Sequence, residues 1–232
     1  MDKQATLHYV YDPYCGWCYG MAPLVSVADE TEGLKVVAHS GGMLAGDQAQ
    51  KISTEWRDFV RPHEERITAL SGQRFGKAYQ EGTQFDYAVE LDSAPPTAAM
   101  LAAESLAGAG IRMLKCLQTA YYVEGQHISE RAELIGIAVE LGLDAGAFAK
   151  AYDAATLNVT EHFRDTQALL EALGGRGYPT LAIEKDGKLS RLHLGRYIGK
   201  PELFRQALAE LLAPASATSS MQGACPSQAA FA

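Results

Sequence analysis

Two closely spaced cysteines near the start of the chain, Cys15 and Cys18, restrict its fold more than any other feature. Residues 5–11 are rich in Tyr, Val and Leu without clean alternation, which predicts a strand buried on both faces. The pattern becomes helical over 15–28, and residues 34–39 predict a second strand. A strand, a helix and a strand joined by short turns make a βαβ unit with parallel strands and a right-handed crossover. The cysteine pair is therefore expected where the first strand passes into the first helix.

The position of this pair predicts redox chemistry. Cys15 is expected at the helix N-terminus with its sulfur exposed, where unpaired backbone N–H groups and the helix dipole favour a thiolate. Because the thiolate is the attacking species in disulfide exchange, Cys15 is the predicted nucleophile. Cys18 lies one helical turn further along the same side, so it can attack the mixed disulfide and release the partner. One thiol captures the substrate and the other resolves the complex.

Metal binding is the main alternative use of a Cys-x-x-Cys motif. Zinc takes about four ligands, usually supplied by a second such pair or by a pair of histidines. The other two cysteines, Cys116 and Cys225, are single and far apart in sequence, and the histidines form no such cluster. Two ordinary core cysteines could share this spacing, but the strand-to-helix junction favours a redox motif. We therefore predict no metal site.

The middle of the chain is predicted to be helical. From about residue 52 to residue 173 almost every segment has helical periodicity. The expected helices are 53–70, 95–107, 110–124, 129–141, 144–154 and 158–173. After a glycine-rich stop, strands are predicted at 180–184 and 189–194 around an Asp-Gly turn, followed by a helix at 201–212. The two ends of the chain thus look like halves of one small sheet, with a helical block between them.

Several local motifs give the chain a specific resemblance to known proteins. Besides the cysteine pair these are Pro23 five residues beyond it, Gly177-Tyr178-Pro179-Thr180 before the late strand, Tyr11-Asp12-Pro13, Gly41-Gly42, Ser71-Gly72, Phe75-Gly76 and Asp92-Ser93-Ala94-Pro95. On these motifs the chain resembles the thioredoxin superfamily, and within it the FrnE-like branch of the DsbA-like dithiol–disulfide oxidoreductases and isomerases. The resemblance covers roughly residues 5–212.

The resemblance implies an α/β protein with a DsbA-like thioredoxin fold, βαβ…αββα, and a large all-helical insertion. The thioredoxin-like domain is expected to be discontinuous, formed by residues 1–45 and 158–212, around an inserted helical domain at 46–157. Residues 213–232 are rich in Ala, Ser, Gln and Pro. They are expected to form a flexible tail, because they cannot bury enough apolar surface to become ordered alone.

The resemblance also implies which residues contact the substrate. In the family, the loop before the late strand packs against the active-site sulfurs, and the Tyr178–Pro179 peptide bond is expected to be cis. The free backbone groups of this loop can pair with an extended substrate segment. Independently of the resemblance, Trp17 is expected to be exposed between the cysteines, where it would cover the sulfurs, or to pack on the helical insertion. The expected catalytic residues are Cys15 and Cys18, and the expected substrate-binding residues are Tyr14, Gly16, Trp17, Tyr178 and Pro179.

Two positions depart from the family pattern. Tyr9 stands six residues before Cys15, where many thioredoxin-like oxidoreductases carry a buried acid, so no carboxylate at this position can relay protons. The dipeptide between the cysteines is Gly16-Trp17 rather than the Pro-His of strong periplasmic oxidants, which predicts a less oxidising disulfide. The direction of catalysis stays open at this point.

The expected function is a thiol–disulfide oxidoreductase or isomerase that acts on protein disulfides. It requires no bound cofactor; its expected partners are thiol- or disulfide-containing proteins, with glutathione or a thioredoxin-type reductant as redox partner. One alternative is a glutathione-dependent isomerase or a kappa-like glutathione transferase on the same fold. Those enzymes typically place Ser where Cys15 stands and use it to orient a glutathione thiolate. Another alternative is a redox-gated binding module, in which the disulfide state controls a partner without turnover.

Composition restricts the expected partners and location. The formal charge of −8 argues against non-specific nucleic-acid binding and gives no reason to expect attraction to anionic lipid. No window approaches the ~18 apolar residues that a membrane-spanning helix requires. The N-terminal residues show no signal-peptide pattern, so a cytoplasmic protein is expected. In that compartment a close cysteine pair is more often catalytic or metal-binding than structural.

The remaining reactive and charged residues are expected to be structural. Cys116 lies in an apolar helix and is expected to be buried and inert. Cys225 is expected to be an incidental exposed thiol in the tail. Tyr121 and Tyr122 are expected to form core rather than a ligand site. The charged side chains of the predicted helix 53–70 are expected to form a solvated face: Arg57, Arg61, Glu64, Glu65 and Arg66.

Overall fold

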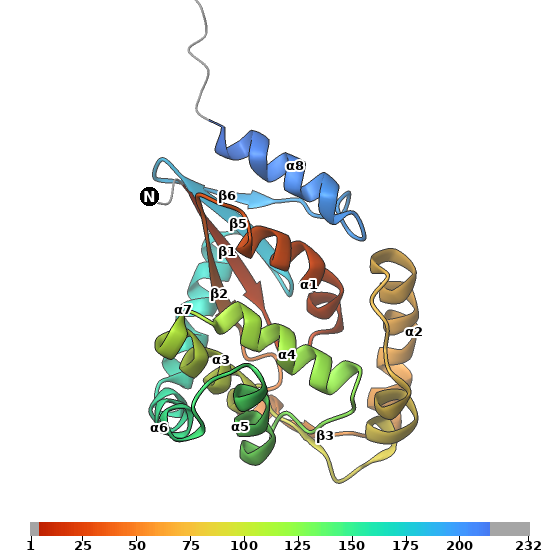
Figure 1. The fold of residues 1–232 in the computed structure, drawn as a ribbon. Helices are drawn as coiled ribbons and strands as arrows, with labels where there is room; N and C mark the ends of the chain where they lie inside the picture. Colours follow the sequence, from red (N-terminus) through yellow and green to blue (C-terminus); the bar gives the residue numbers. More distant parts are fainter. Residues whose placement is uncertain (1–4, 214–232) are drawn as a thin grey trace, which may run out of the picture.

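A four-stranded mixed sheet joins the two ends of the chain in the computed structural model, which describes residues 5–213 (Figure 1). The strand order is β2-β1-β5-β6. β1 (Ala5–Tyr11) runs parallel to β2 (Leu34–Ser40) and antiparallel to β5 (Thr180–Lys185). β6 (Lys188–Leu192) pairs antiparallel with β5 at the edge. The predicted assembly of the two chain ends into one sheet is confirmed.

Both faces of this sheet are covered by helices. On one face, Leu7 and Tyr9 of β1 are buried in a cluster with side chains of α1 (Gly16–Asp29) and α8 (Pro201–Leu212). Because successive strand residues point to opposite faces, His8 lies on the other face. There α7 (Val159–Ala172) contacts β2. The helix α1 therefore packs on the sheet beside α8.

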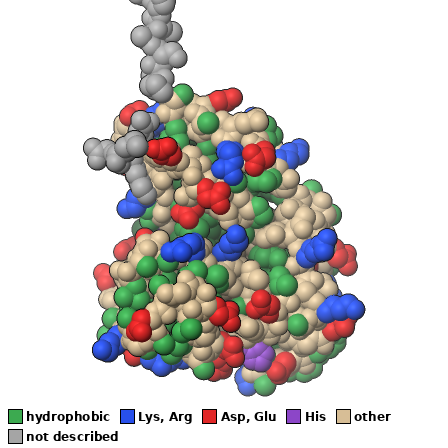
Figure 2. Space-filling model, viewed as in Figure 1, with side chains coloured by type: hydrophobic (Ala, Val, Ile, Leu, Met, Phe, Trp, Pro, Cys, Tyr) green, Lys and Arg blue, Asp and Glu red, His purple; other side chains and the backbone are tan. Residues whose placement is uncertain are grey.

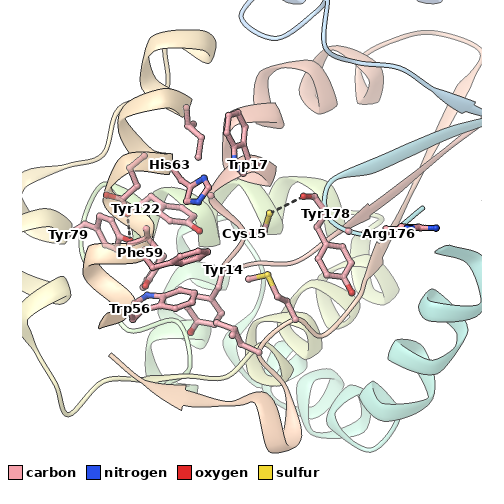
Figure 3. A pocket seen from close by; sticks show the side chains of 18 residues that line it. Tyr14, Cys15, Trp17, Trp56, Phe59, His63, Tyr79, Tyr122, Arg176 and Tyr178 are labelled. Carbon is pink, nitrogen blue, oxygen red and sulfur yellow. Dashed lines mark hydrogen bonds between the residues drawn. The ribbon is translucent and has the colours of Figure 1, made fainter. Parts of the chain in front are cut away.

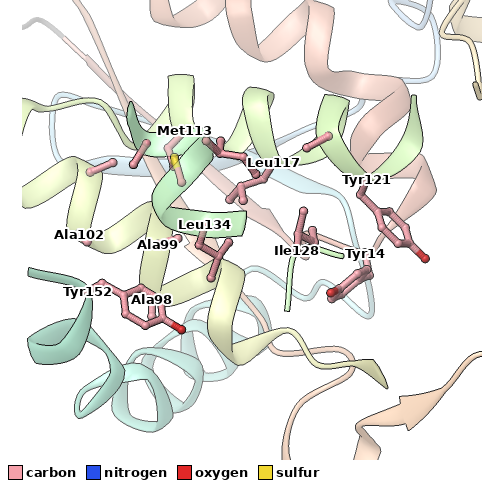
Figure 4. Packing of buried hydrophobic residues seen from close by; sticks show 14 of the residues in the cluster. Tyr14, Ala98, Ala99, Ala102, Met113, Leu117, Tyr121, Ile128, Leu134 and Tyr152 are labelled. Carbon is pink, nitrogen blue, oxygen red and sulfur yellow. The ribbon is translucent and has the colours of Figure 1, made fainter. Parts of the chain in front are cut away.

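A helical block is inserted between β2 and α7 in sequence. Its elements are β3 (Gln50–Lys51), α2 (Thr54–Ser71), β4 (Glu90–Leu91), α3 (Ala94–Ala107), α4 (Gly110–Tyr122), α5 (Arg131–Glu140) and α6 (Ala145–Thr156). Buried side chains of this block form a second hydrophobic cluster (Figure 4). Ala98, Ala99 and Ala102 of α3 let neighbouring helices approach closely, and Met113 and Leu117 of α4 pack against them. Because this cluster includes Tyr14, the helical block also packs on the segment that carries the cysteines.

The predicted helices and strands agree with the observed elements to within about two residues at each end. Several short elements were not predicted, among them single 3-10 turns at Gly46–Gln48 and Thr83–Phe85. β3 and β4 pair in a separate antiparallel sheet, and a π-helical turn covers Ala78–Gly82. Two-residue strands carry no readable periodicity, so no sequence pattern indicates them. The domain boundaries stay a prediction, and the expected tail with Cys225 lies outside the described residues except for Ala213.

The surface view shows acidic and basic side chains interspersed over the face that Figure 2 presents. Within residues 5–213 no helix is both long enough and apolar enough to cross a membrane. The prediction that Cys116 is buried is wrong, because this residue is half-buried on α4. Burial nevertheless raises the pKa of the Cys116 thiol, which keeps it in its less reactive protonated form.

A histidine pair on the α7 side of the sheet predicts a pH dependence of stability. His39 Nε2 lies 3.0 Å from His8 Nδ1, and burial, followed by the charges of His8 and His162, lowers the pKa of His39 to about 4. The unfolded chain therefore binds more protons here than the folded chain as the pH falls from ~6.5 to about 4. The neutral His39 ring therefore contributes to the free energy of unfolding above this pH range. That contribution is lost as the pH falls through the range.

Replacing His39 by Gln removes this dependence while leaving a side chain that can still hydrogen-bond to His8. Between about pH 7 and about pH 4.5, the wild type is expected to lose about 2 kcal/mol more unfolding free energy than H39Q, a value reduced because the ring is only partly buried. Urea unfolding of both proteins at the two pH values measures the difference. An equal loss in both proteins would contradict the assignment.

Candidate active site

Cys15 is the N-cap residue of α1, with φ −81° and ψ 108°. Its Sγ accepts a hydrogen bond from the Cys18 backbone N–H at 3.3 Å, as a capping oxygen does in many helices. The turn before it is closed by a hydrogen bond from the Cys15 N–H to the Asp12 carbonyl, 3.1 Å long. The sulfur therefore sits where the sequence predicts, against the first unpaired N–H groups of the helix. The prediction that it is exposed is wrong, because only 7% of the residue is accessible.

Cys18 is fully buried beneath the N-terminus of α1. Burial, reinforced by the neighbouring Cys15 sulfur, raises the pKa of the Cys18 thiol well above its ordinary value. Cys18 therefore stays protonated while Cys15 faces the partner. A buried thiol in apolar surroundings is unreactive toward outside disulfides, which is consistent with the predicted attack by Cys15.

The Tyr178–Pro179 loop closes the other side of Cys15. The peptide bond is cis, as predicted, and the Tyr178 carbonyl oxygen lies 3.7 Å from Cys15 Sγ (Figure 3). The Tyr178 hydroxyl donates to the Gly41 carbonyl at 3.0 Å, and Gln167 Nε2 donates to both oxygens at 2.7 Å. These bonds fix the loop against the end of β2. A backbone acceptor is thus held beside the Cys15 sulfur.

A cavity of about 450 Å³ opens beside Cys15 between α1 and the helical block, and we call it the α2 pocket (Figure 3). The helix α2 contributes Trp56, Phe59, Val60, His63, Glu64 and Ile67, and aromatic side chains from the rest of the block include Tyr79, Tyr121 and Tyr122. The cavity lies within the usual size range of small-molecule sites and is mostly apolar. It can therefore hold the part of a small substrate that surrounds its sulfur.

Gly16 and Gly20 allow α2 to stand close to the cysteines. A Cβ at Gly16 would lie 3.1 Å from Ile67 Cδ1, and one at Gly20 would lie 2.9 Å from Ile67 Cγ2. These glycines are four residues apart and hence on one face of α1. Arg66 of α2 also lies over the Trp17 ring, 5.7 Å from its centroid. Because Gly16 and Gly20 of α1 carry no side chain, α2 can approach α1 closely and form one wall of the pocket.

The structure brings all the predicted site residues together around Cys15, although their roles stay predictions. Tyr14 and Gly16 line the α2 pocket, and the Tyr14 hydroxyl lies 2.6 Å from Ser129 Oγ. Trp17 lines this pocket and a second cavity that contains Pro179 and Tyr178. Trp17 is half-buried rather than exposed, and it packs against α2 of the helical block, as the alternative prediction states. Tyr121 and Tyr122 are buried core residues, as predicted, but they also line the α2 pocket.

Glu64 is the predicted surface residue whose burial differs most from the prediction. It was expected on a solvated helix face, but it is 3% exposed and lines the α2 pocket. Its Oε1 accepts hydrogen bonds from the Tyr79 hydroxyl at 2.7 Å and from Gln84 Nε2 at 2.9 Å. The two donors lie 15 and 20 residues further along the chain, and helical periodicity cannot reveal such contacts. Arg57, Arg61, Glu65 and Arg66 are partly or fully exposed.

Asp12 is a second polar residue whose role was not predicted. Its fully buried carboxylate accepts hydrogen bonds from the Tyr14 N–H at 2.9 Å, the Met43 N–H at 2.6 Å and the Ser93 hydroxyl at 3.0 Å. Burial raises the pKa of Asp12 to about 6, although the three donors oppose that rise. Asp12 therefore ties the cysteine turn to the loop after β2 and to the start of α3. Three of the motifs noted separately in the sequence meet at this one carboxylate.

Gly41 provides a test of the loop that faces Cys15. A Cβ at Gly41 would lie 2.1 Å from the Tyr178 hydroxyl oxygen, so Gly41→Ala must displace the Tyr178 ring. We expect kcat/KM for disulfide exchange to fall by about tenfold, because the displaced loop no longer positions the substrate against the sulfur. Gly136→Ala is the matched control, since a Cβ on α5 meets nothing within 4 Å. Equal activity in both variants would show that the position of Tyr178 does not matter.

Residues 5–213 contain no group of three or more His, Cys, Asp or Glu side chains arranged to hold a metal ion. What the site does offer is a thiol pair in which one sulfur is approachable and the other is buried behind it. Such a pair can exchange with an external disulfide and then close on itself.

The model of the DSBA-like thioredoxin domain matches residues 6–207. Cytosolic disulfide reductase DsbM from Pseudomonas aeruginosa is 48% identical, with a TM-score of 0.85 over 89% of this chain and 98% of that chain. The structure of that protein with GSH gives 45% identity and a TM-score of 0.83 over the same shares. A structure from Nitrosomonas europaea, 22% identical with a TM-score of 0.71 over 90% of this chain and 98% of that one, supports the fold alone.

A comparison with the curated proteins gives no match. The family model nevertheless covers most of the chain, and the reductase from Pseudomonas aeruginosa is similar over nearly its whole length. The fold of this chain agrees with these relatives. The chain therefore belongs to the DsbA-like thioredoxin domain family, and it is a thiol–disulfide oxidoreductase.

Proposed function

We propose that this oxidoreductase works as a cytoplasmic reductase of disulfides, with Cys15 as the nucleophile, Cys18 as the resolving thiol and glutathione as the reductant. The observation that carries the proposal is the asymmetry of the pair. Cys15 caps α1 at the mouth of a pocket, whereas Cys18 is fully buried with a raised pKa. The similarity to a cytosolic disulfide reductase, also solved with GSH, supports the direction, the compartment and the reductant.

The proposed cycle has four exchange steps, the last two of them with glutathione. The Cys15 thiolate attacks one sulfur of the substrate disulfide, forming a mixed disulfide and releasing the first substrate thiolate. Cys18 then loses its proton and attacks Cys15 Sγ, which releases the second substrate thiolate and leaves a Cys15–Cys18 disulfide. Two glutathione molecules reduce that disulfide and become glutathione disulfide, so two electrons pass from glutathione to the substrate.

The glutathione isomerase or transferase alternative is not favoured, because the chain has two cysteines in the motif and its 48% identical relative is a disulfide reductase. The test is reduction of insulin disulfides by glutathione, with glutathione reductase and NADPH regenerating the thiol. Catalysis above the uncatalysed rate is the expected result. Glutathione conjugation without disulfide reduction would favour the transferase, and a conformational change without turnover would favour the binding module.

A further inference from the structure

Two buried polar atoms, on side chains that line the α2 pocket, have no hydrogen-bond partner among the described residues. They are Glu64 Oε2 and the Tyr122 hydroxyl oxygen. Folded proteins pair nearly all buried polar groups, so each exception calls for an explanation. Two exceptions in one cavity beside the reactive sulfur indicate that a ligand completes their bonding.

The surroundings of Glu64 favour a positively charged ligand group. Oε1 is already occupied by Tyr79 and Gln84, which fixes the carboxylate and leaves only Oε2. Among the described residues, no cation forms an ion pair with Glu64. The neighbouring Arg61 instead donates to Gln84 Oε1 and to the Gln80 carbonyl. A buried carboxylate is seldom left without a charged partner, because its desolvation is costly.

The aromatic lining of the pocket suits the same kind of group. Trp56, Phe59, Tyr79, Tyr121 and Tyr122 all contribute rings to this cavity. The faces of aromatic rings attract cations, most strongly where water is excluded. A carboxylate oxygen among aromatic rings therefore favours an ammonium group over the neutral apolar side chains that rings alone would accept.

We propose that the α2 pocket selects small peptide thiols that carry a free primary ammonium, which donates a hydrogen bond to Glu64 Oε2 while the thiol sulfur reaches Cys15. The ammonium of the γ-glutamyl residue of glutathione has this chemistry. The inference rests on the proposed function, in which glutathione reduces the Cys15–Cys18 disulfide. It adds that Glu64 decides which thiols do so efficiently, with Tyr122 offering a second oxygen to the same group.

The test compares glutathione with its glutaryl analogue, in which hydrogen replaces the amino group of the γ-glutamyl residue. The wild-type disulfide should react at least about tenfold faster with glutathione than with the analogue, the effect of one hydrogen bond to a charged group. In Glu64→Gln the ratio of the two rate constants should fall to about one. Glu65→Gln is the matched control, because Glu65 is exposed on the same helix. It should keep the wild-type ratio.

A second measurement separates this inference from the proposed function. Binding of S-methylglutathione, which cannot exchange, is measured by calorimetry for the wild type, E64Q and E65Q, and dithiothreitol tests that each oxidised protein can be reduced. Weaker binding of S-methylglutathione by E64Q than by the wild type and E65Q supports the inference. If glutathione nevertheless proves a poor reductant, only the proposed reductant is wrong. Equal binding by all three proteins, or an unchanged rate ratio in E64Q, would overturn the assignment of Glu64.

Discussion

Replacing Cys15 by serine will lower the rate of protein-disulfide reduction by about three orders of magnitude or more, as expected when a covalent nucleophile is removed. Cys15 Sγ is the only sulfur of the pair that meets the α2 pocket, and Cys18 is completely buried. The Cys18 thiol also has a raised pKa, so it cannot take over the attack on a protein substrate. The insulin assay with glutathione measures the loss directly.

Cys116→Ser is the control for this prediction, because Cys116 is a half-buried thiol on α4 outside the α2 pocket. Its substitution should leave the rate close to that of the wild type. The fold should survive C15S, since a serine hydroxyl can also cap α1 by accepting from the Cys18 N–H. A C15S protein with substantial activity would mean that another group attacks the substrate.

Replacing Cys18 by serine will convert the enzyme into a trap for its own mixed disulfide. The first attack by Cys15 is retained, but the neighbouring thiol that should release the substrate is gone. Intramolecular attack by a well-oriented group can correspond to an effective concentration of about 10⁵ M or more, far above any external thiol. We therefore expect the lifetime of the mixed disulfide to increase by at least about a thousandfold.

Intact-protein mass measurement after exposure of C18S to glutathione disulfide detects the trapped species as one added glutathionyl group. The wild type should pass through the same species without accumulating it. The double variant C15S/C18S should remain unmodified at this site, which identifies Cys15 as the attachment point. Rapid release from C18S would contradict the resolving role of Cys18, and no adduct at all would contradict the order of attack.

Local sequence signals were sufficient to predict the sheet, the helices and the cysteine junction. The run 5–11 and the helical pattern after it place Cys15 at a helix N-terminus, because strand and helix periodicities are properties of consecutive residues. The same holds for the Asp-Gly turn between β5 and β6, where Asp186 has φ 53° and Gly187 has φ 72°. These features depend on neighbours in the chain, so they can be read without the tertiary structure.

The lining of the site could not be predicted in the same way. Glu64 occupies a helix position whose neighbours are charged, and only the approach of Tyr79 and Gln84 turns it into a buried acceptor. Asp12 is bonded by residues 31 and 81 positions away in sequence. The half-burial of Trp17 follows from the close packing of α2 on Gly16 and Gly20. Each of these facts depends on where the helical block docks, which hydrophobic periodicity does not specify.

The central claim is that Cys15 and Cys18 form a reversible disulfide poised for reduction of substrates. The equilibrium reduction potential of this pair, measured by glutathione titration with alkylation and mass detection, tests the claim most directly. A value of about −270 mV, in the thioredoxin range, is the result that a reductase predicts. A value at or above about −180 mV, or the absence of any reversible Cys15–Cys18 disulfide, would contradict it.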